Sequence, residues 1–173
     1  LARGVPSLMY VIPDFNNPSG VTTSLEKRRQ LAALAEEHNF WIVEDSPYRL
    51  LRYAGQDIPR IWSQASERVL LVSSVSKLLA PGLRVGYAVA KPDLVLALAE
   101  WAVDTYVGPV FLTEAIVHEY CSGGKLDENV ERLKNVYRPR LEATFRALET
   151  HLPSASWTRT EGGFFVGVTL SWA

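Results

Sequence analysis

The sequence of 173 residues contains little cysteine, no excess of basic charge and no long apolar run. Its single cysteine, Cys121, excludes an intrachain disulfide framework and predicts a reducing, cytoplasmic location. Lysine and arginine total 18 against 19 aspartate and glutamate residues, and a net charge of -1 argues against a general nucleic-acid or membrane-surface binder. The 3 histidines are far apart and lack thiol partners, so no metal-site spacing is present. Apolar stretches such as 94–99 are far shorter than the roughly 20 residues that a membrane helix needs.

The residues that are present have globular proportions. Hydrophobic residues make up 47% and charged residues 21% of the chain, and its length fits one domain or slightly more. The chain begins with Leu1 and shows no signal peptide, and residues 168–173 have the pattern of a strand that stops without a polar tail. We therefore expect a piece of a longer protein.

The first half of the chain alternates strand and helix patterns. Apolar runs at 8–12, 40–43 and 69–72 predict buried strands. Between the first two, Thr23 and Glu26 have the spacing of a capping box, and apolar residues then recur on one helical face. A strand, a helix and a strand in this order predict a βαβ unit, and therefore an α/β fold with a mostly parallel sheet flanked by helices.

The second half is mainly helical. The pattern predicts a strand at 85–89, a helix at 93–105 with Pro92 near its start, and a helix at 110–121. A long periodic run begins at Leu126, and Pro139 inside it predicts a kink or a split. Strands are expected at 157–160 and 164–170. The glycine break before the long helix predicts a domain boundary, with residues 1–124 on one side and 125–173 on the other.

Polar clusters follow the predicted strands, at 17–20, 45–48 and 73–77, the last continued by 81–86. In open α/β sheets, ligands bind at the carboxyl edge of the strands. Each cluster alone has an ordinary explanation: a turn, a helix cap or a solvated lysine among serines. Their combination is more specific, and it predicts a ligand site at this edge of the sheet.

The residue types in these clusters suit a phosphorylated pyridine aldehyde. Lys77 can form a Schiff base with a carbonyl carbon, and Asp45 can hold a protonated ring nitrogen. Tyr48 and Asn17 can form hydrogen bonds with a ring oxygen. Phosphate anchors are available as neutral donors and as a planar cationic fork, from Ser74, Ser76 and Arg84.

With these motifs, the sequence resembles the class I/II aminotransferases of the fold-type I pyridoxal-phosphate superfamily, from Tyr10 through Thr169. The motifs that carry the resemblance are Tyr10-x-x-Pro13, Asn17-Pro18-Ser19-Gly20, Glu44-Asp45-x-Pro47-Tyr48, Ser74-x-Ser76-Lys77-x-x-x-Pro81-Gly82-x-Arg84-x-Gly86 and Trp157-x-x-x-Glu161-Gly162-Gly163-Phe164.

The resemblance implies a role for each matched residue. Lys77 would be the lysine that binds pyridoxal 5'-phosphate covalently and moves the proton, and Asp45 would pair with the ring nitrogen. Tyr48 and Asn17 would bond the ring hydroxyl oxygen, with Asn17 also near the substrate carboxylate. The phosphate would be held by Ser74, Ser76 and Arg84.

The resemblance also implies a reaction and an assembly. The reaction is ping-pong transamination between an amino acid and a 2-oxo acid, in a homodimer. Residues 1–124 would be part of the cofactor-binding large domain, and 125–173 the linking helix and the start of the small domain. The sequences of residues 44–48 and 126–128 resemble those of the group of 2-aminoadipate and aromatic or branched-chain aminotransferases. Ser46 differs, since that group commonly has a second aspartate at this position.

Several family features are outside the sequence. The glycine-bearing phosphate loop would precede Leu1, and the arginine that grips the substrate carboxylate would follow Trp172. We therefore expect these 173 residues alone to bind cofactor poorly and not to turn over. Two alternatives stay open: the effector-sensing domain of a winged-helix transcription regulator, and another fold-type I activity such as a lyase.

Overall fold

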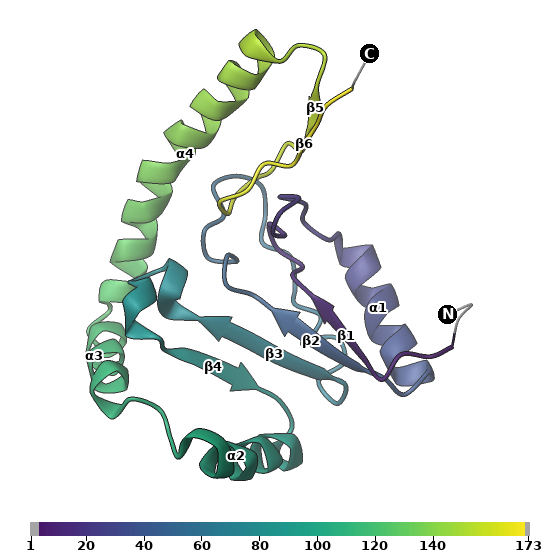
Figure 1. Cartoon of the computed structure of the whole chain (residues 1–173), viewed down its shortest axis with the longest axis vertical. Coiled ribbons are helices and arrows are strands. Elements are labelled where there is room, and N and C mark those ends of the chain that lie inside the picture. Colours follow the sequence, from purple (N-terminus) through teal and green to yellow (C-terminus); the bar gives the residue numbers. More distant parts are fainter. Residues whose placement is uncertain (1–3, 172–173) are drawn as a thin grey trace.

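The computed structural model describes residues 4–171, which form a mixed α/β fold around a sheet of four strands (Figure 1). The sheet has the order β1 (Leu8–Val11), β2 (Trp41–Asp45), β3 (Val69–Ser74) and β4 (Gly86–Val89). β1, β2 and β3 are parallel, and β4 is antiparallel to β3. The predicted α/β class, βαβ unit and mostly parallel sheet are therefore confirmed.

The helices lie in two separate groups around the sheet. In Figure 1, α1 lies beside β1 and β2, whereas the later helices lie beyond β4 and the end of β3. The four α-helices are α1 (Leu25–Glu37), α2 (Pro92–Tyr106), α3 (Phe111–Ser122) and α4 (Lys125–His151). Two short 3₁₀ turns, η1 (Val75–Lys77) and η2 (Pro81–Leu83), join β3 to β4. Pro92 occupies the first turn of α2, as predicted.

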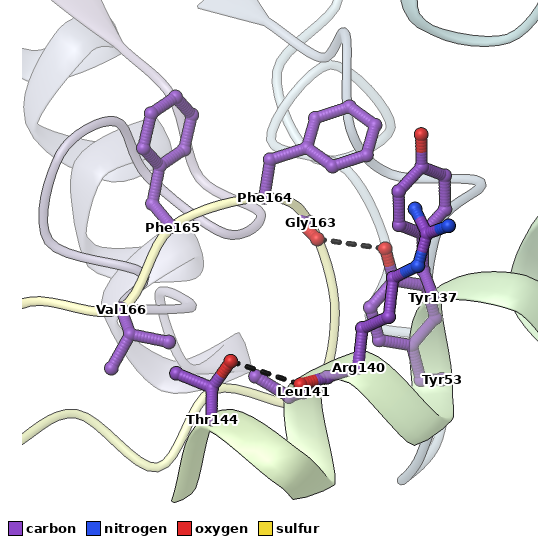
Figure 2. A pocket seen from close by; sticks show the side chains of 9 residues that line it. All are labelled: Tyr53, Tyr137, Arg140, Leu141, Thr144, Gly163, Phe164, Phe165 and Val166. Atoms are coloured by element: carbon purple, nitrogen blue, oxygen red, sulfur yellow. Dashed lines mark hydrogen bonds between the residues drawn. The ribbon is translucent and has the colours of Figure 1, made fainter. Parts of the chain in front are cut away.

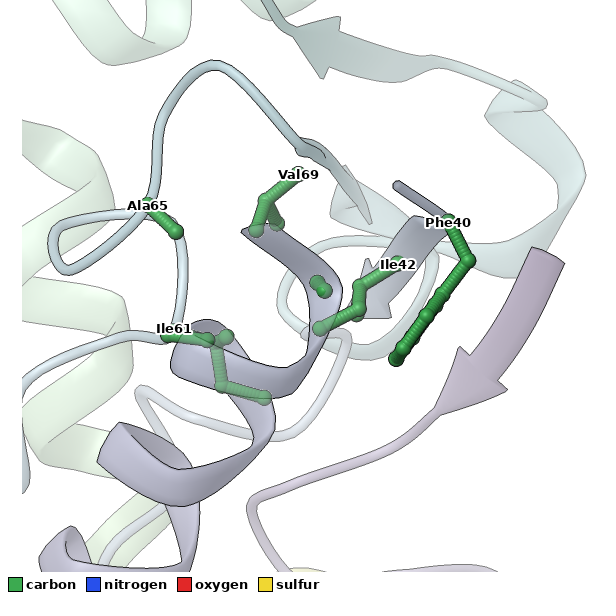
Figure 3. Packing of buried hydrophobic residues seen from close by; sticks show 7 residues of the cluster. Phe40, Ile42, Ile61, Ala65 and Val69 are labelled. Atoms are coloured by element: carbon green, nitrogen blue, oxygen red, sulfur yellow. The ribbon is translucent and has the colours of Figure 1, made fainter. Parts of the chain in front are cut away.

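The main hydrophobic core lies between α1 and the sheet (Figure 3). Ala32 and Ala35 of α1 face Ile42 and Val69, and small residues on the helix allow this close approach. The helix begins one residue later than the capping box predicted. Ser24 is the N-cap, and its hydroxyl accepts a hydrogen bond from the Lys27 backbone N–H at 3.4 Å, so Thr23 is not the cap.

Pro139 does not split the long helix, as the sequence had predicted it could. α4 is a single helix from Lys125 to His151 with Pro139 inside it. Pro139 and Asn135, whose carbonyl loses its helical partner, are both exposed. Water can therefore take the place of the missing hydrogen bond, and the helix continues.

The C-terminal segment contains less strand than predicted. Only β5 (Ser156–Trp157) and β6 (Val168–Thr169) form a ladder, and the end of the predicted strand at 168–173, Trp172 and Ala173, lies outside the described residues. The backbone between them bonds to loops instead of to another strand. The Tyr53 N–H donates to the Glu161 carbonyl at 2.7 Å, and the Gly167 N–H donates to the Ser19 carbonyl at 3.2 Å. These bonds bring residues 160–167 onto the 17–20 turn.

Within residues 4–171, no helix is long and apolar enough to cross a membrane. The same residues contain no cluster of three or more side chains suited to hold a metal ion.

Candidate active site

The predicted site residues come from neighbouring strands at one edge of the sheet. Asp45 ends β2 and lies beside Val72 in the parallel register with β3. The Ser73 hydroxyl donates to the Ser46 carbonyl at 3.0 Å, which ties the two strand ends together. Because β4 is antiparallel, Gly86 at its start pairs with Ser74 at the end of β3. The segment that carries Arg84 therefore reaches the same edge as Asp45 and Lys77.

Tyr10 holds the carboxylate of Asp45, a contact that the sequence analysis did not anticipate. The Tyr10 hydroxyl donates a hydrogen bond to Asp45 Oδ2. Burial, with this bond and the charge of Asp45, raises the pKa of Tyr10 to about 12. The register of the two strands explains this contact. Tyr10 pairs with Val43, and Asp45 lies two residues beyond Val43 on the same face of the sheet.

Tyr48 and Asn17 are brought together by a side-chain hydrogen bond, as their predicted shared task requires. Tyr48 is buried, and its ring packs edge-to-face against Phe164 at 5.9 Å and Phe165 at 5.6 Å between centroids. Burial raises the pKa of Tyr48, while the bond to Asn17 opposes this shift. Asn17 itself is exposed on its turn. The C-terminal phenylalanines thus position a side chain of the sheet edge.

Lys77 ends the short turn η1, whose start is capped by a predicted site residue. The Ser74 hydroxyl accepts a hydrogen bond from the Ser76 N–H at 2.9 Å. Lys77 is exposed, and its amine forms no hydrogen bond or ion pair with the residues that the structure describes. The amine is therefore accessible to a ligand at the edge.

Arg84 lies at the end of η2 in a left-handed backbone conformation, with φ of 54°. This conformation is uncommon outside glycine and asparagine and is concentrated at functional sites. Its guanidinium is exposed and donates only one hydrogen bond, to the Pro81 carbonyl at 3.3 Å, among the contacts of residues 4–171. Four further guanidinium N–H groups are therefore available to an anion.

A buried cluster of charges fixes the start of the loop that carries Asn17. Asp14 is fully buried and accepts a bond at 2.7 Å from Arg28, which is itself fully buried. Arg49 and Arg52 approach the same carboxylate at 3.5 and 3.4 Å. Arg52 also pairs with Glu161 at 2.9 Å. The cluster joins β1, α1, the loop after β2 and the C-terminal segment, and sequence reasoning gave it no role.

A separate cavity of about 290 Å³ lies between α4 and the C-terminal segment. Figure 2 shows Tyr137, Arg140 and Thr144 of α4 facing the backbone at Gly163–Val166. The Tyr53 hydroxyl closes one side by donating to the Gly163 carbonyl at 2.7 Å. None of the predicted site residues lines this cavity, so the candidate active site is the sheet edge.

Comparison with known proteins identifies the family. The sequence model of "Aminotransferase class I and II" matches residues 7–172, and the chain belongs to this family. It is 39% identical to the aromatic-amino-acid aminotransferase 1 of Thermococcus litoralis, over 94% of this chain and 40% of that protein. It is 35% identical to the 2-aminoadipate transaminase of Thermus thermophilus, over 98% of this chain and 44% of that protein.

A transcriptional regulator is also among the relatives. The chain is 32% identical to the uncharacterized HTH-type transcriptional regulator YdfD of Bacillus subtilis, over 95% of this chain and 34% of that protein.

Solved structures share the fold. The multiple substrate aminotransferase of Thermococcus profundus matches with a TM-score of 0.91 and 38% identity, over 95% of this chain and 41% of that one. LysN, the α-aminoadipate aminotransferase of Thermus thermophilus, matches with a TM-score of 0.89 and 32% identity, over 98% of this chain and 44% of that one. LysN was solved with N-(5'-phosphopyridoxyl)-L-leucine. The chain thus spans less than half the length of these relatives, and its sheet and helices are part of the fold-type I architecture.

Proposed function

We propose that the full-length protein is a pyridoxal-phosphate-dependent aminotransferase. The observation that carries the proposal is the convergence of Lys77, Asp45 and Arg84 at one sheet edge, on a chain that belongs to the class I and II aminotransferases. A reactive amine, a carboxylate and a guanidinium on adjacent strand ends suit the carbonyl, the ring nitrogen and the phosphate of this cofactor.

The donor set of the sheet edge fits each polar group of pyridoxal phosphate. Asp45, held by Tyr10, offers its carboxylate to the ring nitrogen, and the hydrogen-bonded pair Tyr48 and Asn17 faces the ring oxygen. Arg84 and the short turn at Ser74–Lys77 offer donors to the phosphate. We assign Asn17 a second contact, to the carboxylate of the substrate.

The chemistry of the reaction divides between cofactor and protein. When bound, pyridoxal phosphate supplies an electron sink for the electrons left when a proton leaves the substrate α-carbon. Lys77 would hold the cofactor through its amine, and the same amine, when free, would take and return that proton. Asp45 would keep the ring nitrogen protonated, because an opposite charge favours the charged form.

The substrates we propose are an amino acid and a 2-oxo acid, exchanged in two half-reactions. The relatives named for aromatic amino acids and 2-aminoadipate support a donor of that size. We also propose a homodimeric assembly. Support comes from the large apolar side chains that α2 and α3 leave exposed, among them Trp101, Phe111 and Leu112.

The second candidate is an effector-sensing domain of a transcription regulator. The similarity to the regulator YdfD favours it. The intact Asn17-Pro18-Ser19-Gly20 turn and the Asp45-x-Pro47-Tyr48 motif favour the enzyme instead. A winged helix encoded upstream of this segment would decide for the regulator. A lyase on the same scaffold is distinguished by its product, since it would release a fragment of the amino acid instead of its 2-oxo acid.

Borohydride labelling tests the proposal in the full-length protein. Incubation with pyridoxal phosphate and reduction with borohydride should place the label on Lys77, located by peptide mass spectrometry. Lys77→Arg should carry no label and should lose transamination of an aromatic or 2-aminoadipate donor. A wild-type protein labelled elsewhere, or not at all, would contradict the assignment. We expect the 173-residue chain alone to bind cofactor poorly and to show no turnover.

A further inference from the structure

A second cavity lies beneath the turn that carries Lys77. It has a volume of about 220 Å³ and is enclosed by the ends of β2 and β3, the start of β4, and α3; we call it the β3–α3 cavity. Most of its wall is apolar, formed by Val75, Leu78, Val85, Val117 and Leu126. Lys77 stands between two of these residues in the sequence, so the same short turn η1 contributes to the cavity wall and carries the exposed lysine.

Two polar side chains in the wall are buried without a partner. Ser46 is 5% exposed, and its hydroxyl forms no hydrogen bond with residues 4–171. Arg60 Nη1 is likewise buried and unbonded within the described chain. A buried polar group without a partner costs free energy, and a charged one costs more. A ligand that supplies acceptors to both groups would recover that free energy.

The segments that carry the two polar groups are tied together by Glu44. Side chains alternate along β2, so Glu44 and Ser46 lie on one face. The Glu44 carboxylate accepts the backbone N–H of Ile61 at 3.2 Å, directly after Arg60 in the chain. Glu44 thus ties the segment after Arg60 to the strand end that precedes Ser46, while its own oxygens accept hydrogen bonds from Ile61 and Trp62.

The charge in the wall is positive. Arg49 and Arg60 line the cavity, and no acidic residue does among the residues described. Arg49 is already bound to Asp57 and to the Ile58 carbonyl. Arg60 forms no ion pair within 4.0 Å of a described carboxylate, although its charge favours the ionised form of the nearby Glu44. Its Nη1 is left without a hydrogen bond in a largely apolar wall.

From this combination we propose that the β3–α3 cavity binds a small monocarboxylate with a compact apolar body. The carboxylate would accept hydrogen bonds from Arg60 Nη1 and the Ser46 hydroxyl, and the apolar body would contact Val75, Val117 and Leu126. An apolar cavity of roughly 150 Å³ accepts benzene, so about 220 Å³ accommodates a ring with one carboxylate. The cavity wall includes Ser74, one of the proposed phosphate anchors, whereas Arg60 and Ser46, which would bind the carboxylate, are not among the residues assigned to the cofactor.

Benzoate is a suitable probe, and benzamide is its neutral analogue of the same shape. Binding to the full-length protein is measured by calorimetry and by ligand-observed NMR. We expect Arg60→Gln to weaken benzoate binding by about tenfold to hundredfold, because bonds to a charged group are worth about 1.5–3 kcal/mol. Benzamide should bind the wild type and Arg60→Gln with affinities within about twofold, since it carries no charge.

Two further variants distinguish this cavity from the sheet edge. Val117→Phe fills the cavity and should abolish benzoate binding, whereas a ligand at the sheet edge would be unaffected. If Val117→Phe does not fold, Ser46→Asp serves instead, because it supplies a carboxylate beside Arg60 and should exclude benzoate. Benzoate binding that survives these changes would overturn the proposal. A dissociation constant weaker than about 10 mM for the folded wild type would overturn it as well.

Discussion

Asp14 is the point at which three arginines meet inside the protein. Both Asp14 and Arg28 are fully buried, so each depends on the other to compensate for lost hydration. The start of the Asn17 loop is held by hydrogen bonds of fixed direction. They include the bonds that Arg28 donates to the Pro13 and Thr23 carbonyls at 3.1 and 2.9 Å. The loop is therefore held by directional bonds and not only by packing.

Removing the charge of Asp14 should be strongly destabilising. Asp14→Asn leaves Arg28 buried without its counter-charge, and we expect a loss of about 3–5 kcal/mol in the free energy of unfolding. Asp57→Asn is the matched control, because Asp57 also pairs with Arg49 but is largely exposed. It should cost no more than about 1 kcal/mol. Urea unfolding of both variants measures the difference. Equal losses in the free energy of unfolding would contradict the conclusion that Asp14 compensates the buried charge of Arg28.

The bond between Tyr10 and Asp45 should be visible in an alkaline titration. The pKa of Tyr10 is raised to about 12 in the folded protein, so the folded state holds its proton more tightly than the unfolded state. Its contribution to stability is present below the ordinary tyrosine pKa and is lost as the pH rises through about 12.

Tyrosinate absorbance measures this directly. Subtracting the titration curve of Tyr10→Phe from that of the wild type should leave one ionisation, with a pKa well above the usual tyrosine range. Asp45→Asn should lower the pKa of Tyr10 only in part, because burial is the larger cause of the raised pKa and this substitution does not remove it. An ordinary tyrosine pKa in the difference curve would argue against the contact.

At the scale of elements, glycines allow the C-terminal segment to reach the sheet. A Cβ at Gly162 would lie 2.4 Å from the Leu51 carbonyl oxygen and 2.5 Å from Phe15 Cζ. Gly163 follows with φ of 70°, which side chains rarely adopt. The Gly162-Gly163 pair is therefore required for close packing beside the Asn17 loop.

Gly162→Ala should shift this segment and destabilise the protein by about 1–3 kcal/mol through overpacking. Gly108→Ala is the control, since nothing lies within 4 Å of a Cβ there and its φ is not positive. It should be neutral or slightly stabilising. Thermal unfolding compares the two variants, and an unchanged midpoint for Gly162→Ala would contradict the packing described.

The sequence predicted the elements better than their connections. Apolar periodicity located the strands, α1 and the later helices, since burial of one face leaves a local pattern. The candidate site residues were proposed from polar clusters after the predicted strands, and their individual roles from the resemblance to the family. Contacts between distant segments leave no such pattern: neither the pairing of Arg52 with Glu161 nor the burial of Tyr48 by Phe164 is visible before the chain is folded. The prediction of a kink or split at Pro139 rested on helix propensity alone. The exposed position of Pro139 lets water replace the missing hydrogen bond, so the helix continues.

At the scale of the whole molecule, the apolar surface of α2 and α3 is too large for a lone domain. Trp101, Phe111 and Leu112 are 65%, 82% and 69% exposed, and neighbouring valines add to the patch. Such patches mark contacts with other protein surfaces. In the described residues this face has no cover, which is the basis for the proposed interface.

Charge introduced on this face should dissociate the assembly. We expect Trp101→Glu with Phe111→Glu to convert the full-length protein from dimer to monomer in light-scattering chromatography, since charge at an apolar interface is not compensated. Glu142→Lys, on the exposed side of α4, should leave the mass unchanged. A dimer that tolerates the double substitution would place its interface elsewhere.

The return of residues 160–167 to the 17–20 turn also bears on the order in which a nascent chain matures. Arg52 bridges to Gly162, more than a hundred positions later, and Ser19 receives the N–H of Gly167. On the ribosome, α1 and the first strands can assemble while the rest is still being synthesised. The turn bearing Asn17 gains its final support only after the last of these residues has left the exit tunnel, so a loop that is translated well before residues 160–167 is completed only with them.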